Sequence, residues 1–91
     1  MPSDEGVQLP AAAEYVATLA DLGPGQRGTV QRIGGEDVEL RRRLLALGVV
    51  RGAEIVVDRA APLGDPRAYT LLGYRLTLRN DDARVILVQP D

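Results

Sequence analysis

The sequence predicts a mainly β protein, a small five-stranded barrel or α+β roll with one α-helix inserted between strands 1 and 2. Two observations predict this fold. Short runs of β-branched residues and leucine alternate with glycine and proline along most of the chain, as expected for short strands joined by tight turns. Residues 36–48 instead repeat apolar side chains at the spacing of an amphipathic helix.

The chain divides into a tail and one domain. Residues 1–17 are expected to be a flexible N-terminal tail, because they combine acids, two prolines and a run of three alanines without a strong core face. The barrel domain is expected at residues 18–89. At its start, Thr18 can cap a short turn that directs Leu19 and Leu22 to the same side, and residues 23–25 (Gly-Pro-Gly) predict a type II turn.

The first strand and the helix follow. The strand is expected at residues 28–33, with a bulge, because Val30 and Ile33 have opposite parity. Asp37 is suited to cap the helix, and Gly48 to end it in the left-handed conformation. Arg41 falls inside the apolar arc, so its head must reach solvent or a partner. The apolar arc consists of Val38, Leu40, Leu44, Leu45 and Leu47. Core packing is the simplest role for its leucines. If the helix lies over the mouth of the barrel, however, one of Leu44, Leu45 and Leu47 could line a shallow apolar groove with Val49 and Leu63.

Four further strands are expected at residues 55–57, 67–72, 74–79 and 85–88. Tyr74, Leu76 and Leu78 alternate with polar residues, so we expect all three to face the core. Replacing Leu76 by alanine should then cost about 2–5 kcal/mol. Asn80 is expected to cap a single helical turn over residues 81–83.

The composition argues against catalysis and cofactors. The chain has no His, Cys or Lys, and its one serine lies in the tail, so the usual general bases and nucleophiles are missing. No glycine-rich segment has the lysine and spacing of a phosphate-binding loop. Iron could be held only by carboxylates, carbonyls and water, a ligand set better suited to magnesium or calcium. We therefore expect no enzyme activity, no cofactor and no specific metal site.

Charge and hydropathy restrict the partners. Eleven arginines against thirteen acids give a net charge of -2, which disfavours nucleic acid as a partner. No apolar run approaches the ~20 residues of a membrane span, so direct membrane insertion is not expected. The acidic start lacks the basic region of a secretory signal. These features predict a cytoplasmic protein.

Several motifs occur in a characteristic order. R-R-L-L-A-L-G-V-V-R-G-A-E-I-V-V fills residues 42–57, and A-P-L-G-D-P fills residues 61–66. T-L-A-D-L-G-P-G-Q-R-G-T-V precedes them at residues 18–30, and G-Y-R-L-T-L-R and A-R-V-I-L-V follow at residues 73–79 and 83–88. This ordered set resembles the FeoA family of bacterial ferrous iron uptake. Arg51 departs from the pattern, since many relatives have proline there.

The resemblance implies a five-stranded Src-homology-3-like barrel with an added helix. It also implies a non-enzymatic accessory protein that binds the cytoplasmic part of the FeoB transporter, supports its assembly or activity, and is recruited by it to the inner face of the cell membrane. One alternative is a stand-alone regulatory barrel related to the C-terminal domain of iron-dependent repressors, although residues 1–17 are too few for a winged helix. A general peptide-binding module is another, although Trp and Phe are absent.

The partner surface is expected where the helix meets the following loop. Arg43 belongs to the R-L-x-x-L-G pattern of the family, and Leu63 is a large apolar residue on a proline-stiffened loop. The residues of this hypothetical site are Arg43, Leu47, Val49, Pro62, Leu63 and Asp65. Arg41, Arg42 and Arg43 spread over about 200° of the helix, so they do not form one patch. The oligomeric state is left open.

Overall fold

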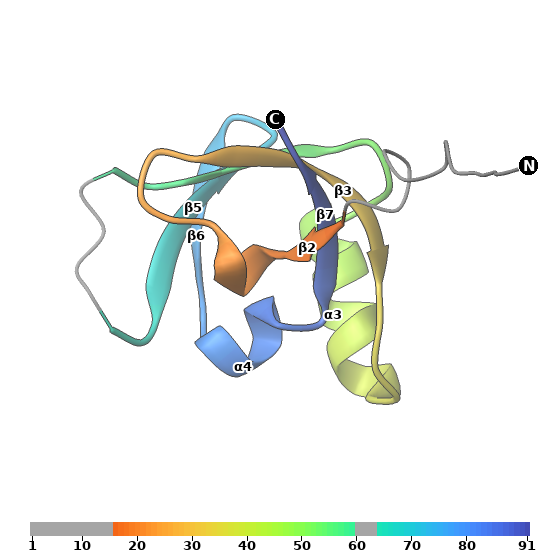
Figure 1. Cartoon of the computed structure of the whole chain (residues 1–91). Coiled ribbons are helices and arrows are strands. Elements are labelled where there is room, and N and C mark those ends of the chain that lie inside the picture. Colours follow the sequence, from red (N-terminus) through yellow and green to blue (C-terminus); the bar gives the residue numbers. More distant parts are fainter. Residues whose placement is uncertain (1–15, 60–63) are drawn as a thin grey trace, which may run out of the picture.

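The computed structural model describes residues 16–59 and 64–91, and its strands form one curved antiparallel sheet (Figure 1). The strands are β2 (Ala17–Thr18), β3 (Arg27–Ile33), β4 (Glu54–Val57), β5 (Arg67–Leu71), β6 (Tyr74–Leu78) and β7 (Ile86–Pro90), in the order β2-β7-β3-β4-β5-β6. The helices are the 3-10 turn η1 (Leu19–Asp21), α3 (Val38–Leu47) and the single turn α4 (Asn80–Ala83). The expected mainly β fold with an inserted helix is confirmed.

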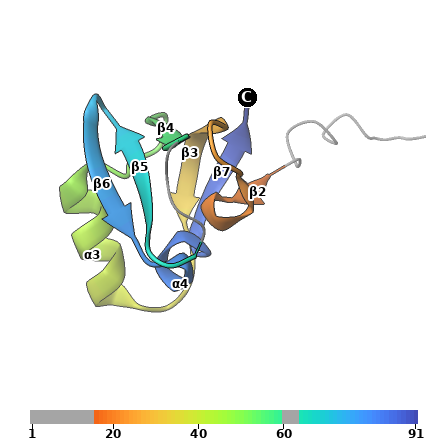
Figure 2. The ribbon, with the colours of Figure 1, turned by 90° about the vertical axis from the view of Figure 1, so that its left-hand side faces the viewer.

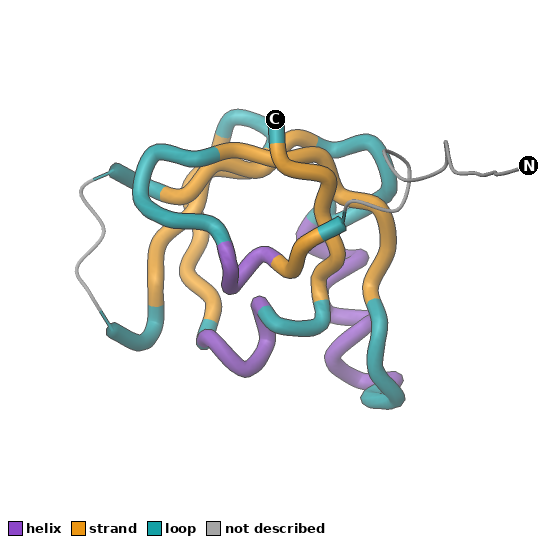
Figure 3. Tube along the Cα trace, viewed as in Figure 1, coloured by secondary structure: helices purple, strands orange, loops and turns teal. Residues whose placement is uncertain are grey.

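The sheet curls around its core without closing completely (Figure 3). Among the described residues no ladder joins the two edge strands, β2 and β6. Instead η1 and α4 contact each other between these edges. The structure has one strand more than the five expected, the short N-terminal strand β2. Its first residue, Ala17, was expected in the tail but pairs with Val88 of β7. The rest of the expected tail lies outside the described residues.

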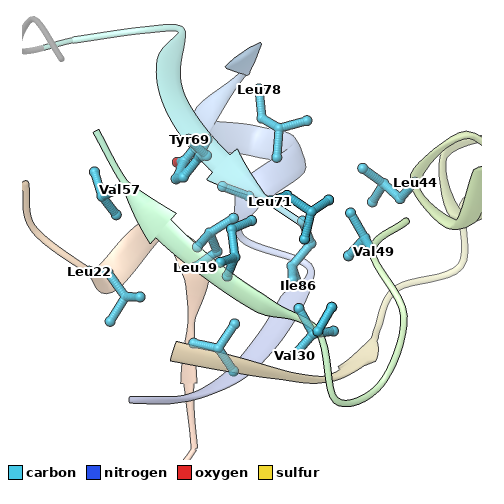
Figure 4. Packing of buried hydrophobic residues seen from close by; sticks show 14 of the residues in the cluster. Leu19, Leu22, Val30, Leu44, Val49, Val57, Tyr69, Leu71, Leu78 and Ile86 are labelled. Carbon is cyan, nitrogen blue, oxygen red and sulfur yellow. The ribbon is translucent and has the colours of Figure 1, made fainter. Parts of the chain in front are cut away.

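Strand β3 bends where the sequence predicted a bulge. Its pairing with β7 shifts register between Val30 and Arg32, so Gln31 is the extra residue. The shift lets Val30 point into the core while the chain turns toward α3. Figure 4 shows Val30 in one cluster with Ile86 of β7, Leu71 of β5 and Leu44 of α3. The largest fully buried side chains are Tyr69, Leu19, Leu44, Ile55, Leu71 and Ile86.

Both ends of α3 agree with the sequence. The Asp37 carboxylate accepts a hydrogen bond from the Leu40 N–H at 2.9 Å, and Gly48 ends the helix at φ 102°. The Arg41 guanidinium turns back and donates to the Gly35 carbonyl at 2.7 Å. That hydrogen bond explains how an arginine is accommodated inside the apolar arc.

Core packing, the simplest role for the leucines of the apolar arc, was wrong for Leu45 and Leu47. Leu40 and Leu44 are buried, but Val38, Leu45 and Leu47 are 57%, 47% and 41% exposed. The helix therefore rests on the sheet along a stripe narrower than its apolar arc. The two margins of the arc stay exposed on either side of it.

Strand β6 also differs from the expectation. Leu78 is buried, whereas Leu76 is half-buried and Tyr74 is exposed. The reason is position: β6 is the last strand in the sheet, paired only with β5, so its inward face has core on one side alone. Alternation gave the correct face but not the depth of burial.

The cap of α4 was assigned to the wrong residue. Arg79 occupies the N-cap position, and Asn80 is the first residue of the turn. The Asp65 carboxylate, from the loop before β5, accepts a hydrogen bond from the Asn80 N–H at 2.9 Å. The cap is thus supplied by a segment 15 residues away in sequence, which no local pattern reveals.

Candidate docking surface around helix α3

A hollow of about 280 Å³, which we call the β6-side hollow, lies between α3 and the strand β6. Figure 2 shows α3 on the same side of the molecule as β6. Leucines form much of the wall, and Arg43, Arg79 and Asp82 supply the charges. The lining residues are Leu40, Arg43, Leu44, Leu47, Pro66, Thr77, Leu78, Arg79 and Asp82.

A second depression, the β3-side groove, lies along the opposite margin of α3 and has a volume of about 230 Å³. Strand β3 and the turn after the helix form its other wall. Its lining is apolar apart from three arginines and one glutamine, and it contains no acid. The lining residues are Gln31, Arg32, Ile33, Arg41, Leu45, Val49, Val50 and Arg51.

The C-terminal end of α3 is held by the turn between β5 and β6. The Tyr74 hydroxyl donates a hydrogen bond to the Leu47 carbonyl, one of the carbonyls left free at a helix end. Leu72 lies across Gly48, because a Cβ placed on Gly48 would be 2.7 Å from the Leu72 Cδ1. Leu72 is itself largely exposed. These contacts fix the position of the exposed helix margin near Leu47.

The structure brings together only part of the residue set expected at the partner site. Arg43 and Leu47 line the β6-side hollow beside Pro66. Val49 is fully buried and forms the floor of the β3-side groove, so it is a core residue beneath that surface. Asp65 is exposed but caps α4. Pro62 and Leu63 lie outside the described residues.

Sequence reasoning missed other exposed apolar residues near α3. Leu45 was assigned to the core, and Val50 and Leu72 were assigned no role, yet all three are exposed. The signal was the width of the apolar arc, which exceeds what one side of a single helix buries against a small sheet. An apolar arc wider than its contact leaves exposed margins, and such margins are typical of interaction sites.

The described residues hold little chemistry of other kinds. They contain no group of three or more acidic, histidine or cysteine side chains placed to bind a metal. Within the same ranges, no helix has the length and apolar character to cross a bilayer. The two depressions, of about 280 and 230 Å³, lie at the lower end of the sizes found for small-molecule sites.

Fold and surface together define a small Src-homology-3-like barrel with an α-helix on its side and apolar residues exposed on both margins of that helix. The model of the FeoA domain matches residues 17–90. The chain belongs to the FeoA family, which is involved in ferrous iron transport.

A curated relative from Porphyromonas gingivalis is described as an Fe(2+) transport protein A/Fe(2+) transporter FeoB fusion protein. It is 38% identical over 71 residues, which cover 78% of this chain and 8% of the relative. The chain thus corresponds to a small part of that protein's length.

Several solved structures have the same fold. A FeoA-like protein from Clostridium acetobutylicum has a TM-score of 0.73 and 36% identity, covering 84% of this chain and 87% of the other. FeoA from Chlorobium tepidum has a TM-score of 0.69 and 44% identity, covering 78% and 67%. FeoA from Stenotrophomonas maltophilia, solved with zinc, is described as a prokaryotic Src-homology-3 domain protein; its TM-score is 0.69 at 27% identity, covering 78% and 87%.

The barrel also resembles part of a manganese-dependent transcriptional repressor. The TM-score is 0.75 at 21% identity, over 84% of this chain and 37% of the repressor. At that identity the likeness shows a shared fold alone. This likeness therefore gives no support for a regulatory function like that of the iron-dependent repressors.

Proposed function

We propose that this protein is a non-enzymatic accessory domain that docks on the cytoplasmic part of a FeoB-type ferrous iron transporter and supports its assembly or activity. The observation that carries the proposal is the P. gingivalis relative, in which the matching domain and a transporter share one polypeptide. Domains fused in one protein stay close together, and separate chains with the same task need a binding surface in place of the covalent link.

The surface proposed for that contact is α3 with its two margins. Leu45 projects on the β3 side and Leu47 on the β6 side, each more than two-fifths exposed. Burying exposed leucines of this kind on association is worth up to about 2 kcal/mol each, before the costs of association. Arg43 stands beside Leu47 in the β6-side hollow and supplies a charged edge to the contact.

Pro62 and Leu63 belong to the proposal on sequence grounds. The variant Leu63→Glu shows whether Leu63 contacts the transporter or belongs to the core. For this variant, the melting temperature and the binding to the transporter's cytoplasmic region are measured together. Lost binding with an unchanged melt supports a contact. A large drop in melting temperature makes Leu63 a core residue, and no change in either value removes the loop from the interface.

The proposal is tested by mixing the purified chain with the purified cytoplasmic region of the FeoB-type transporter from the same organism. Light scattering after size exclusion should give the mass of a complex, and calorimetry should give a Kd of about 10 µM or tighter. No complex at several times that concentration would contradict the proposed function. A transporter gene beside the gene for this chain would add independent support.

A further inference from the structure

We propose that the β3-side groove binds an acidic amphipathic segment, one that presents apolar side chains to the groove and carboxylates to the arginines around it. The inference rests on the proposed function, since we assign the segment to the cytoplasmic part of the transporter. It adds the chemistry of the segment and the side of α3 on which it lies.

The charge around the groove is one-sided. Arg32 comes from β3, Arg41 from α3 and Arg51 from the turn after the helix, and all three line the same groove. No acid lines it. This accumulation occurs on a chain whose net charge is -2, so it is a local feature and does not follow from an overall excess of arginine over acids.

Four of the other eight arginines form ion pairs within the described residues, whereas the three groove arginines form none. Within the described residues, Arg27, Arg42, Arg75 and Arg84 form ion pairs with Glu54, Glu39, Asp58 and Asp81. None of the three groove arginines forms an ion pair with a described residue, and Arg41 uses its guanidinium on a backbone carbonyl. The groove therefore presents positive charge that a partner's carboxylates could pair with.

The apolar part of the groove determines what else the segment must carry. Leu45 and Val50 are 47% and 43% exposed, and the buried Val49 lies beneath them. Apolar side chains from a partner would cover this exposed surface. A segment with carboxylates alone would leave it in water, and a purely apolar one would leave the arginines unpaired.

A nucleic acid fits these features less well. Its phosphates would pair with the arginines, but the groove has no aromatic side chain on which a base could stack. A sugar-phosphate backbone also offers little apolar surface to Leu45 and Val50. The acidic, apolar polypeptide is the occupant that matches both halves of the lining.

The test is a charge reversal with a matched control. Arg32→Glu/Arg51→Glu reverses two groove charges that make no hydrogen bond or ion pair with the described residues, so the fold should be retained. Arg59→Glu reverses one exposed arginine outside the groove. It is compared with the single groove variant Arg51→Glu, which changes the net charge by the same amount. Binding to the transporter's cytoplasmic region is measured by calorimetry at low and high NaCl.

We expect the double groove variant to weaken binding about tenfold or more at low salt and Arg51→Glu alone to weaken it about threefold or more. Arg59→Glu should stay within about twofold of wild type, and added salt should weaken wild-type binding. Unchanged binding by the groove variant would overturn the inference and leave the proposed function standing. Absence of binding by every chain, wild type included, would overturn both.

A photo-crosslinker at position 50 identifies the bound segment. Mass spectrometry should recover a transporter peptide with several Asp or Glu among Leu, Ile, Val or Phe. A basic or uncharged peptide, or a crosslink to a second copy of this chain, would overturn the inference. So would binding to anionic vesicles or duplex DNA that the groove variant abolishes while transporter binding persists.

Discussion

The carboxylate of Asp65 accepts a hydrogen bond from the backbone N–H of Asn80 at 2.9 Å, and so caps α4 from outside the helix. The Asn80 side chain returns a weaker hydrogen bond to the Gly64 carbonyl at 3.4 Å. These two hydrogen bonds join Gly64 and Asp65, which precede β5, to the helical turn α4, which precedes β7. A residue expected at a partner site from the sequence therefore has a structural role at this junction.

Asp65→Ala should lower the free energy of unfolding by about 1 kcal/mol, the usual cost of losing a side-chain cap. Asp65→Asn keeps an acceptor oxygen and should lose only part of that amount. Chemical denaturation followed by circular dichroism measures both. Equal stability of wild type and Asp65→Ala would mean that the cap contributes nothing in solution.

Gly48→Ala should destabilise more than Gly52→Ala. Both glycines have positive φ, 102° and 92°, so alanine is strained at either position by roughly 1 kcal/mol or more. At Gly48 the new methyl would also lie 2.7 Å from Leu72, whereas nothing lies within 4 Å at Gly52. Thermal denaturation gives the difference. Equal losses would show that Leu72 moves aside without cost.

Leu78→Ala should cost more than Leu76→Ala. Leu78 is buried and lines the β6-side hollow, so its truncation should cost about 2–4 kcal/mol, while the half-buried Leu76 should cost about 1–2 kcal/mol. The value for Leu76 is lower than alternation alone predicts. Denaturant titrations of the two variants side by side check the order, and the reverse order would contradict the assignment of β6 as a partly covered edge.

The purified protein should not bind ferrous iron specifically. The sequence has no imidazole or thiolate, and hard oxygen ligands alone favour magnesium or calcium over iron. Anaerobic calorimetry with Fe²⁺, with Mg²⁺ as a control for weak carboxylate binding, measures this directly. One stoichiometric iron site of about micromolar affinity would contradict the expectation.

Features set by neighbouring residues could be predicted from the sequence. Asp37 and Gly48 define the ends of α3 through contacts within four residues, and the parity change between Val30 and Ile33 marks the bulge. Features set by distant segments could not. The burial of Leu76 depends on the position of β6 at the edge of the sheet, where only β5 flanks it. The cap of α4 depends on the position of Asp65, which precedes it by 15 residues in the sequence.

The candidate surface divides in the same way. Arg43 and Leu47 were predicted together because one short motif carries both, and both line the β6-side hollow. Arg32 and Arg51 belong to different elements, and no pattern in the sequence indicates that they lie beside each other. They meet at one groove only because the bulged end of β3 and the turn after α3 lie next to each other.

The most direct test of docking through α3 compares Leu47→Glu with Val16→Glu, because the two wild-type side chains are almost equally exposed. Leu47, on the margin of α3, is 41% exposed, and Val16, next to β2, is 40% exposed. Kd for the transporter's cytoplasmic region is measured by biolayer interferometry, and melting temperature by circular dichroism. We predict that both variants keep the wild-type melt, that Leu47→Glu binds at least about tenfold more weakly, and that Val16→Glu stays within about twofold. Wild-type affinity in a folded Leu47→Glu variant, or an equal loss in Val16→Glu, would contradict docking through α3.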